Sequence, residues 1–328
     1  MKISENWLRT WVNPAVDSET LSNQLTMLGL EVDEMIPAAK PFTGVVVGEV
    51  LTVEQHPDAD RLRVTTVNIG TAETLQIVCG APNVRVGMKA PVATIGAVLP
   101  GDFKIKKGKL RGIESQGMLC GASEIDLEDK IDGLLELPSD APVGINIREY
   151  LNLDDHVIDI SITPNRGDCF SIRGIAREIA VINQLAVTEP VITAVAATIS
   201  DEKKVVVDTD GCPRYLGRVI KNVNTKAATP AWMEQALARS GMRQHSILVD
   251  ITNYVLIELG QPLHAFDGAK VQGAVHVRQA TAAEKLVLLN EQEVELQDNV
   301  MVIADDEKAL AMAGIMGGLS SSVTDETT

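Results

Sequence analysis

The chain has 328 residues, 45% of them hydrophobic and 23% charged, which is enough for two or three globular domains. Its formal net charge of -16 excludes a protein that coats nucleic acid nonspecifically and leaves room only for localised contacts. Aromatic residues make up 3% of the chain, which argues against an RNA module that reads a base sequence by stacking.

The sequence gives no sign of a membrane segment or a disulfide framework. The N-terminal stretch MKISENWLRTWVNP has no apolar signal core, and no run of 18 apolar residues occurs, so we expect a cytoplasmic protein without a membrane partner. The four cysteines lack the paired spacing of zinc sites and disulfide scaffolds: Cys79, Cys120, Cys169 and Cys212. We therefore predict buried free thiols and no metal site.

Residues 1–39 are predicted to form a small α/β piece. Asp17 or Ser18 can cap a helix that carries Leu21, Leu25 and Leu28 on one face and ends at Gly29, and LEVDEMIP follows as a strand. A piece of this size cannot bury a core of its own. It therefore needs a partner elsewhere in the chain.

Residues 40–151 are predicted to form a small β domain. Short β-prone runs separated by Gly and Pro occur at GVVVGEV, RLRVTTVN, LQIVCG and APVATIGAVLP, and a final ribbon runs from Gly101 to Cys120. About five such strands are typical of a closed or nearly closed barrel.

The ribbon concentrates positive charge in an acidic chain. Against one acid, Asp102, it carries five cations: Lys104, Lys106, Lys107, Lys109 and Arg111. Such a cluster can bind a phosphate backbone. It can also be a solvated edge strand whose lysines prevent edge-to-edge pairing, and the charges alone favour this second interpretation.

Three signatures in this region resemble a known family. HPDADRLRVTTVNIG, IVCGAPN and KLRGIESQGMLC resemble, in order and spacing, the tRNA-binding module of several synthetases and free-standing tRNA-binding proteins. The resemblance covers about residues 40–151. It implies an OB-fold barrel that binds tRNA structure rather than a base sequence, with the five cations of the ribbon as tRNA-binding residues.

Residues 152–199 again show the alternation of strand and helix patterns predicted for residues 1–39. VIDISI is predicted as a strand, and the helix after it places on one face Ile172, Ile175, Ala176, Ile179 and Ile182. Between them lies a polar loop with Asn165, Arg166 and Asp168, which is a ligand cluster or, as such runs more often are, a hydrogen-bonded turn with a helix cap. We predict a discontinuous domain, 1–39 with 152–199, around the inserted barrel.

TPNRGDC with GIAREIA resembles the β subunits of bacterial phenylalanyl-tRNA synthetase. The resemblance implies a partner, the catalytic α subunit, in an (αβ)2 heterotetramer that uses ATP and Mg²⁺ to attach phenylalanine to tRNA(Phe). It places the aminoacylation site on the other subunit, so neither ATP nor Mg²⁺ is expected on these residues.

Residues 200–328 are predicted to form an α/β domain on a mixed sheet. VVVD and YLGRVIKNV are predicted strands. Thr229 is predicted to cap a helix with Pro230 in its first turn and Gly241 at its end, and SILVDITNYVLIEL forms a second helix that Gly260 ends. Further strands are predicted around AVHVR, KLVLLN and VMVIAD before a Gly-rich end.

This last region holds the candidate catalytic residues: Arg243, Thr252, Asn253, His264, Gly314, Gly317 and Gly318. Taken alone, His264 in its apolar Pro-Leu-His-Ala-Phe context is more typical of a hydrogen-bonded core histidine. The glycines indicate a turn or a close backbone approach, and without a following Gly-Lys-Ser/Thr they are no phosphate loop.

CPRYLGRVI, VDITNYVLIELGQPLHAFD and ALAMAGIMGG resemble the editing domain of the same subunit, which hydrolyses tyrosine wrongly esterified to tRNA(Phe). The resemblance implies that His264 helps to place the water, that Thr252 and Asn253 line the pocket, and that the three glycines let the backbone approach the substrate. Among these residues, the resemblance to the family's editing site is weakest for Arg243. No Ser-His-Asp set is evident, and an ester needs only a positioned water and an oxyanion donor.

An editing site meets a physical need, because a hydrophobic pocket cannot strongly reject an isostere that merely adds a hydroxyl.

Family members continue well beyond Thr328, so we expect an N-terminal portion. The predicted fold is α+β and multidomain, an OB-fold barrel inserted in a discontinuous α/β domain and followed by an incomplete editing domain, 200–328, truncated at its C-terminal end. The alternatives are a non-catalytic tRNA-binding module, which a hydrolysis assay would separate, and a stand-alone misacyl-tRNA deacylase.

Overall fold

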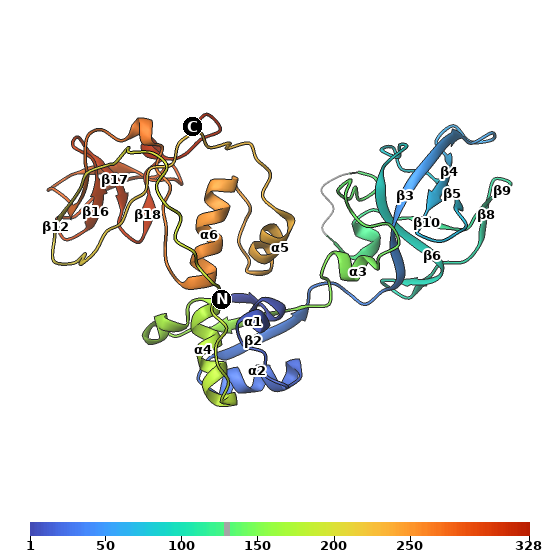
Figure 1. Ribbon diagram of the computed structural model, residues 1–328, viewed down its shortest axis with the longest axis horizontal. Helices are drawn as coiled ribbons and strands as arrows, with labels where there is room; N and C mark the ends of the chain where they lie inside the picture. The colour runs from blue at the N-terminus through green and yellow to red at the C-terminus, as the bar shows by residue number, and fades with distance from the viewer. Residues whose placement is uncertain (128–131) are drawn as a thin grey trace. The chain divides into compact units, whose positions relative to one another are not determined.

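The computed structural model describes residues 1–127 and 132–328, which form two compact units (Figure 1). The first unit comprises Met1–Glu34 and Ile158–Thr328, and the second comprises Met35–Val157. The first unit is therefore assembled from two stretches that lie far apart in the sequence.

The N-terminal part of the first unit is built on a three-stranded sheet with the order β1-β11-β2. Its elements are β1 (Lys2–Ser4), α1 (Glu5–Trp11), α2 (Ser18–Met27), β2 (Glu31–Pro37), β11 (His156–Ser161) and α4 (Ile172–Asn183). Of the two predicted caps, Asp17 and Ser18, it is Asp17 that caps α2, because its side chain accepts a hydrogen bond from the Thr20 N–H. Each helix buries a narrower face than predicted, because Leu28 is half-buried after the end of α2 and Ile182 is exposed.

The second unit contains an antiparallel sheet with the strand order β10-β6-β3-β4-β5, to which β7 adds beside β6. The strands are β3 (Thr43–Gln55), β4 (Arg63–Asn68), β5 (Leu75–Cys79), β6 (Lys89–Leu99), β7 (Phe103–Lys104) and β10 (Gly117–Leu119). The Gln116 N–H donates to the Gln76 carbonyl at 2.8 Å and links the two ends of this path. Among the described residues no strand ladder closes the predicted barrel, so the sheet remains open.

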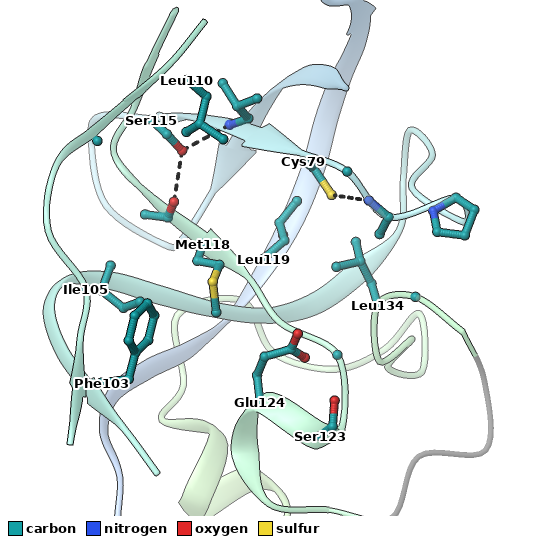
Figure 2. A pocket seen from close by; sticks show the side chains of 18 of the residues that line it. Cys79, Phe103, Ile105, Leu110, Ser115, Met118, Leu119, Ser123, Glu124 and Leu134 are labelled. Carbon is teal, nitrogen blue, oxygen red and sulfur yellow. Dashed lines mark hydrogen bonds between the residues drawn. The ribbon is translucent and has the colours of Figure 1, made fainter. Parts of the chain in front are cut away.

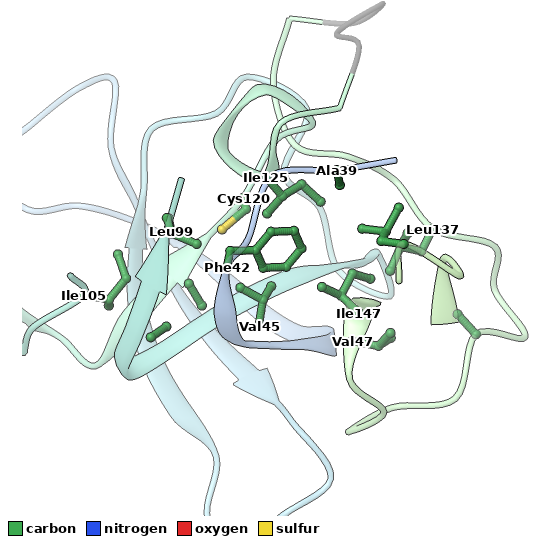
Figure 3. Close-up of a cluster of buried hydrophobic side chains, with 14 residues drawn as sticks. Ala39, Phe42, Val45, Val47, Leu99, Ile105, Cys120, Ile125, Leu137 and Ile147 are labelled. Carbon is green, nitrogen blue, oxygen red and sulfur yellow. The ribbon is translucent and has the colours of Figure 1, made fainter. Parts of the chain in front are cut away.

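One face of this sheet buries a core around Phe42, Val45 and Val47, which Figure 3 shows. Ile147, at the start of the short helix α3 (Ile147–Tyr150), is fully buried in the same cluster. The Arg148 guanidinium lies 4.8 Å from the centre of the Phe42 ring. A strand and a helix from opposite ends of the second unit therefore share one core.

The C-terminal part of the first unit is built on a sheet with the order β12-β13-β16-β17-β18. Its elements are β12 (Val205–Asp208), α5 (Ala231–Arg239), α6 (Ile247–Leu259), β13 (Val275–Gln279), β16 (Met301–Ala304), β17 (Ala309–Met312) and β18 (Met316–Gly317), with the separate hairpin of β14 (Lys285–Val287) and β15 (Glu293–Glu295). β12 is parallel to β13 and the other pairs are antiparallel, so the sheet is mixed, as predicted.

Two local predictions in this region are wrong. The predicted strand YLGRVIKNV is irregular, and its Leu216 and Ile220 are 74% and 67% exposed, because no described strand pairs with it. Thr229 does not cap α5, since its hydroxyl donates to the buried Asp250 carboxylate at 2.6 Å instead. By contrast, α6 ends at Gly260 in the left-handed conformation, as predicted.

No helix among the described residues has the length and apolar character needed to span a membrane. All four cysteines are free, and Cys212 is half-buried where a buried thiol was predicted.

Candidate functional sites

His264 lies in the loop that joins α6 to β13 and makes an edge contact with Phe266. Their ring centres are 4.5 Å apart at an interplanar angle of 65°. Phe266 is held in turn by a β-bridge to Ser322. His264 is exposed, and partial desolvation of its imidazole by the surrounding protein lowers the pKa of the ring.

Gly317, at the end of β18, is the glycine that meets His264. A Cβ added at Gly317 would lie 2.3 Å from His264 Cε1 and 2.8 Å from Nε2, closer than any real contact. The Gly317 carbonyl accepts a hydrogen bond from the Leu289 N–H at 3.0 Å, which fixes this backbone. The absence of a side chain at residue 317 therefore makes room for the histidine ring.

The other two glycines do different things. A Cβ at Gly318 would lie 2.5 Å from the Leu310 carbonyl oxygen, so this glycine allows close packing of the backbone against β17. Gly314 has a φ of +71° in the turn between β17 and β18, and a Cβ there would meet nothing within 4 Å. Of the three candidates, the structure places Gly317 alone against the imidazole.

Thr252 and Asn253 lie together on α6. The Thr252 hydroxyl donates to the Val249 carbonyl of its own helix at 2.7 Å. Within residues 1–127 and 132–328, no hydrogen bond, ion pair or ring contact joins Thr252 or Asn253 to His264. Arg243 is exposed between α5 and α6. The geometry thus groups His264 with Gly317 and Phe266. Phe266 was not among the predicted site residues, although it lies only two residues after His264 in the sequence.

The basic ribbon forms a tight hairpin at its distal end. β8 (Gly108–Leu110) pairs with β9 (Ile113–Ser115) around Arg111 and Gly112, whose φ angles of +40° and +90° match a turn in which both central residues are left-handed. All five cations are exposed. Lys107 pairs with Glu114 at 2.9 Å, and this lysine, ahead of Lys109, holds the pKa of Glu114 below its usual value.

Polar side chains tie this hairpin to the main sheet. His56 is 2% exposed; its Nδ1 accepts from the Asp58 N–H at 3.1 Å, so its Nε2 carries the proton and donates to the Leu110 carbonyl at 3.2 Å. Gln76 Nε2 donates to the Glu114 carbonyl at 2.8 Å. His56 therefore positions the hairpin, a role that the HPDAD signature did not reveal because its contact is remote in sequence.

The polar loop before α4 is a hydrogen-bonded turn. Ser171 caps α4 by accepting from the Gly174 N–H, and Arg166 pairs with Asp168 at 3.1 Å and Glu178 at 3.0 Å. Asp168, Cys169 and Glu178 are close enough to ligate a metal ion, but the Arg166 guanidinium donates to the Cys169 sulfur and to both carboxylates. A guanidinium thus supplies the positive charge in this cluster.

Both candidate sites fall within matched family models. The model described as "Putative tRNA binding domain" matches residues 45–146, and the model described as "B3/4 domain" matches residues 211–328. The phenylalanine--tRNA ligase beta subunit of Acinetobacter baylyi is 80% identical over the whole chain, and that of Psychrobacter arcticus is 62% identical. The chain belongs to the family of phenylalanine--tRNA ligase beta subunits.

The chain spans 41% of the Acinetobacter beta subunit and 42% of the Psychrobacter one. Among solved structures, an N-terminal fragment of the phenylalanyl-tRNA synthetase β-subunit from Pyrococcus horikoshii is 15% identical, covering 53% of this chain and 54% of that chain with a TM-score of 0.26. Membership in the beta-subunit family therefore rests on the sequence matches that run along the whole of this chain. The basic hairpin lies in the tRNA-binding match, and His264 with Gly317 lies in the B3/4 match.

Proposed function

We propose that the chain is the N-terminal part of a phenylalanine--tRNA ligase β subunit that works with a catalytic α subunit in an (αβ)2 heterotetramer in the cytoplasm. The identity of 80% along the whole chain supports this assignment. The heterotetramer would attach phenylalanine to tRNA(Phe) with ATP and Mg²⁺. Among the described residues, the one cluster of metal-ligating groups holds Arg166, which does not fit a metal ion, so we assign ATP and Mg²⁺ to the α subunit.

Within this assembly the chain would divide into an N-terminal domain of residues 1–39 and 152–199, an OB-fold tRNA-binding domain of residues 40–151, and an editing domain that begins at residue 200. The antiparallel sheet whose end strands are linked through Gln116 and Gln76, together with the tRNA-binding family match, supports an OB-fold. The five exposed cations of the basic ribbon would supply its contact with tRNA phosphates.

The editing domain would hydrolyse Tyr-tRNA(Phe). The observation that carries this proposal is the exposed His264 side chain, whose ring packs against the Gly317 backbone. A neutral imidazole holds and orients a water molecule through a ring nitrogen, and the ester of a misacylated tRNA needs no side-chain nucleophile. Thr252, Asn253, Gly314 and Gly318 remain proposed contributors to the wall and backbone of this pocket.

The test follows release of tyrosine from preformed Tyr-tRNA(Phe) by the complete β subunit with its α subunit. His264→Ala should abolish the release while charging with phenylalanine stays normal, because charging takes place on the other subunit. The matched control is His276→Ala, which removes an imidazole on β13 that pairs with Asp306. Wild-type hydrolysis by the His264→Ala enzyme would refute the assignment.

A second candidate function is tRNA binding alone, which the exposed hairpin favours independently of His264. Under that function the wild type, His264→Ala and His276→Ala would all release tyrosine at the uncatalysed rate. A stand-alone deacylase, the third possibility, requires hydrolysis without an α subunit, and co-purification of the two subunits would count against it.

A further inference from the structure

A cavity of about 560 Å³ opens between the basic ribbon and the sheet of the second unit (Figure 2). Apolar side chains of β5 and β10 line it, Val78, Met118 and Leu119, together with Leu134 from the segment after residue 132. Its size falls within the ~300–1,000 Å³ of small-molecule sites. A cavity of this kind suits a flat, partly apolar ligand.

Phe103 is the aromatic residue of the cavity wall. It is 60% exposed, whereas Ile105 is 5% exposed, and both residues line the cavity (Figure 2). An exposed ring at the edge of a concave apolar site is suited to stacking against a ligand.

The polar groups around the cavity differ from one side to the other. Lys104 and Lys106 line it next to Phe103, and both are exposed without an ion pair in the described part of the chain. Ser123 and Glu124 line it at the start of the 3-10 turn η1 (Ser123–Ile125), and both are exposed (Figure 2). Cations thus accompany the aromatic ring, while a hydroxyl and a carboxylate lie at the other wall.

We propose that this cavity binds one unpaired nucleotide of an RNA. The base stacks on Phe103 and covers the apolar floor, the phosphate pairs with Lys104 and Lys106, and the Glu124 carboxylate accepts a hydrogen bond from an N–H of the base. The proposal rests on the proposed tRNA-binding function of this unit and deepens it. A base inside a duplex is stacked on both faces and cannot enter, so the site selects an unpaired position.

The first test measures binding of the 328-residue chain to a tRNA(Phe) transcript as salt is varied. Phe103→Ala should weaken binding about 5- to 150-fold, the range for loss of one stacked base, without changing the salt slope. Phe103→Trp should retain the affinity. The matched control is Ile95→Ala on β6, which removes a side chain that is 52% exposed and lies outside the cavity lining.

The second test identifies the nucleotide with a set of transcripts that each lack one base. Removal of the base at one unpaired position should weaken binding of the transcript to the wild type. The wild type and Phe103→Ala should bind that transcript equally well, because the stacked base is already missing. Glu124→Gln should change the preference among the bases at that same position. Near-ultraviolet circular dichroism of each variant verifies that the fold is kept.

The outcomes separate the two proposals. If the wild type binds tRNA and Phe103→Ala binds equally well, the nucleotide site is wrong and tRNA binding by this unit stands. If Phe103→Ala loses as much affinity for a fully paired RNA duplex, the ring contacts the backbone and the site is also wrong. If the wild type binds no tRNA, both proposals fall.

Discussion

At the scale of single residues, Gly317 and Gly318 are neighbours in sequence with unlike surroundings. The space beside Gly317 is filled by the end of a side chain, the His264 ring, whereas the space beside Gly318 is filled by the backbone carbonyl of Leu310. A side chain can rotate away from an added methyl group, but a paired strand cannot. The two glycines should therefore fail in different ways when they are substituted.

Gly317→Ala should displace the His264 ring and lower hydrolysis of Tyr-tRNA(Phe) at least tenfold with little change in melting temperature. Gly318→Ala should instead lower the free energy of unfolding by about 1–3 kcal/mol, typical of overpacking against a backbone. Hydrolysis rates and thermal unfolding of both variants check this. Equal effects of the two substitutions on both measurements would contradict the placement of His264 against Gly317.

The pKa of His264 gives a prediction for pH dependence. Desolvation favours the neutral imidazole and lowers its pKa from the usual 6.5. Hydrolysis that needs the neutral ring should stay constant above this pKa and fall as pH drops through it, with a midpoint below 6.5. The unfolded chain binds this proton more readily than the folded one, so the folded state also loses stability as pH falls through this range.

A pH–rate profile of Tyr-tRNA(Phe) hydrolysis measures this midpoint. The residual rate of His264→Ala should lack the acidic limb altogether. A midpoint above 6.5 would show that the ring is not desolvated in the way the structure indicates.

At the scale of elements, the β8–β9 hairpin is a two-stranded sheet tied to the main sheet by side chains. An isolated hairpin is at best marginally stable in water. His56 and Gln76 therefore hold the cations of the hairpin in place through the Leu110 and Glu114 carbonyls. The orientation of the basic surface depends on a residue from a loop elsewhere in the second unit.

His56→Ala should remove both hydrogen bonds of the ring and lower the free energy of unfolding of the second unit by about 1–3 kcal/mol. Amide hydrogen exchange in residues 108–115 should accelerate, and tRNA affinity should fall with an unchanged salt slope, because no cation is lost. His245→Ala, in the first unit, is the matched histidine control. Unchanged exchange in the hairpin would show that the backbone alone fixes it.

At the scale of the whole molecule, the formal charge of -16 opposes binding to RNA outside a local cationic surface. Lys107 is paired with Glu114, so the basic ribbon offers less free charge than the count of its cations indicates. The electrostatic contribution should therefore be concentrated in Lys104, Lys106, Lys109 and Arg111.

Replacing Lys104, Lys106, Lys107 and Lys109 by alanine should weaken tRNA binding and flatten its dependence on salt. Lys107→Ala alone should have a smaller effect than Lys109→Ala, because Glu114 already neutralises Lys107. Binding isotherms between ~50 and ~200 mM salt test this. An unchanged slope in the fourfold variant would support the solvated edge strand weighed in the sequence analysis.

The sequence by itself determined the features that depend on neighbouring residues and on family resemblance. It narrowed the cap of α2 to Asp17 or Ser18, and it predicted the Gly260 end of α6, the strands of the second unit and the mixed sheet of the last region. Caps, turns and strand alternation are decided within a few residues, so local patterns suffice to predict them. The signatures in the two matched regions likewise identified the family.

Only the tertiary structure decided which remote groups meet. Thr229 was expected to cap a helix but bonds to Asp250, 21 residues away, and His56 reaches Leu110 across 54 residues. The irregular run around Leu216 failed as a strand because its alternating pattern has no described partner. The contact between His264 and Gly317 also joins residues that are remote in sequence. The sequence shows a glycine at residue 317 but does not show which side chain fills the space beside it.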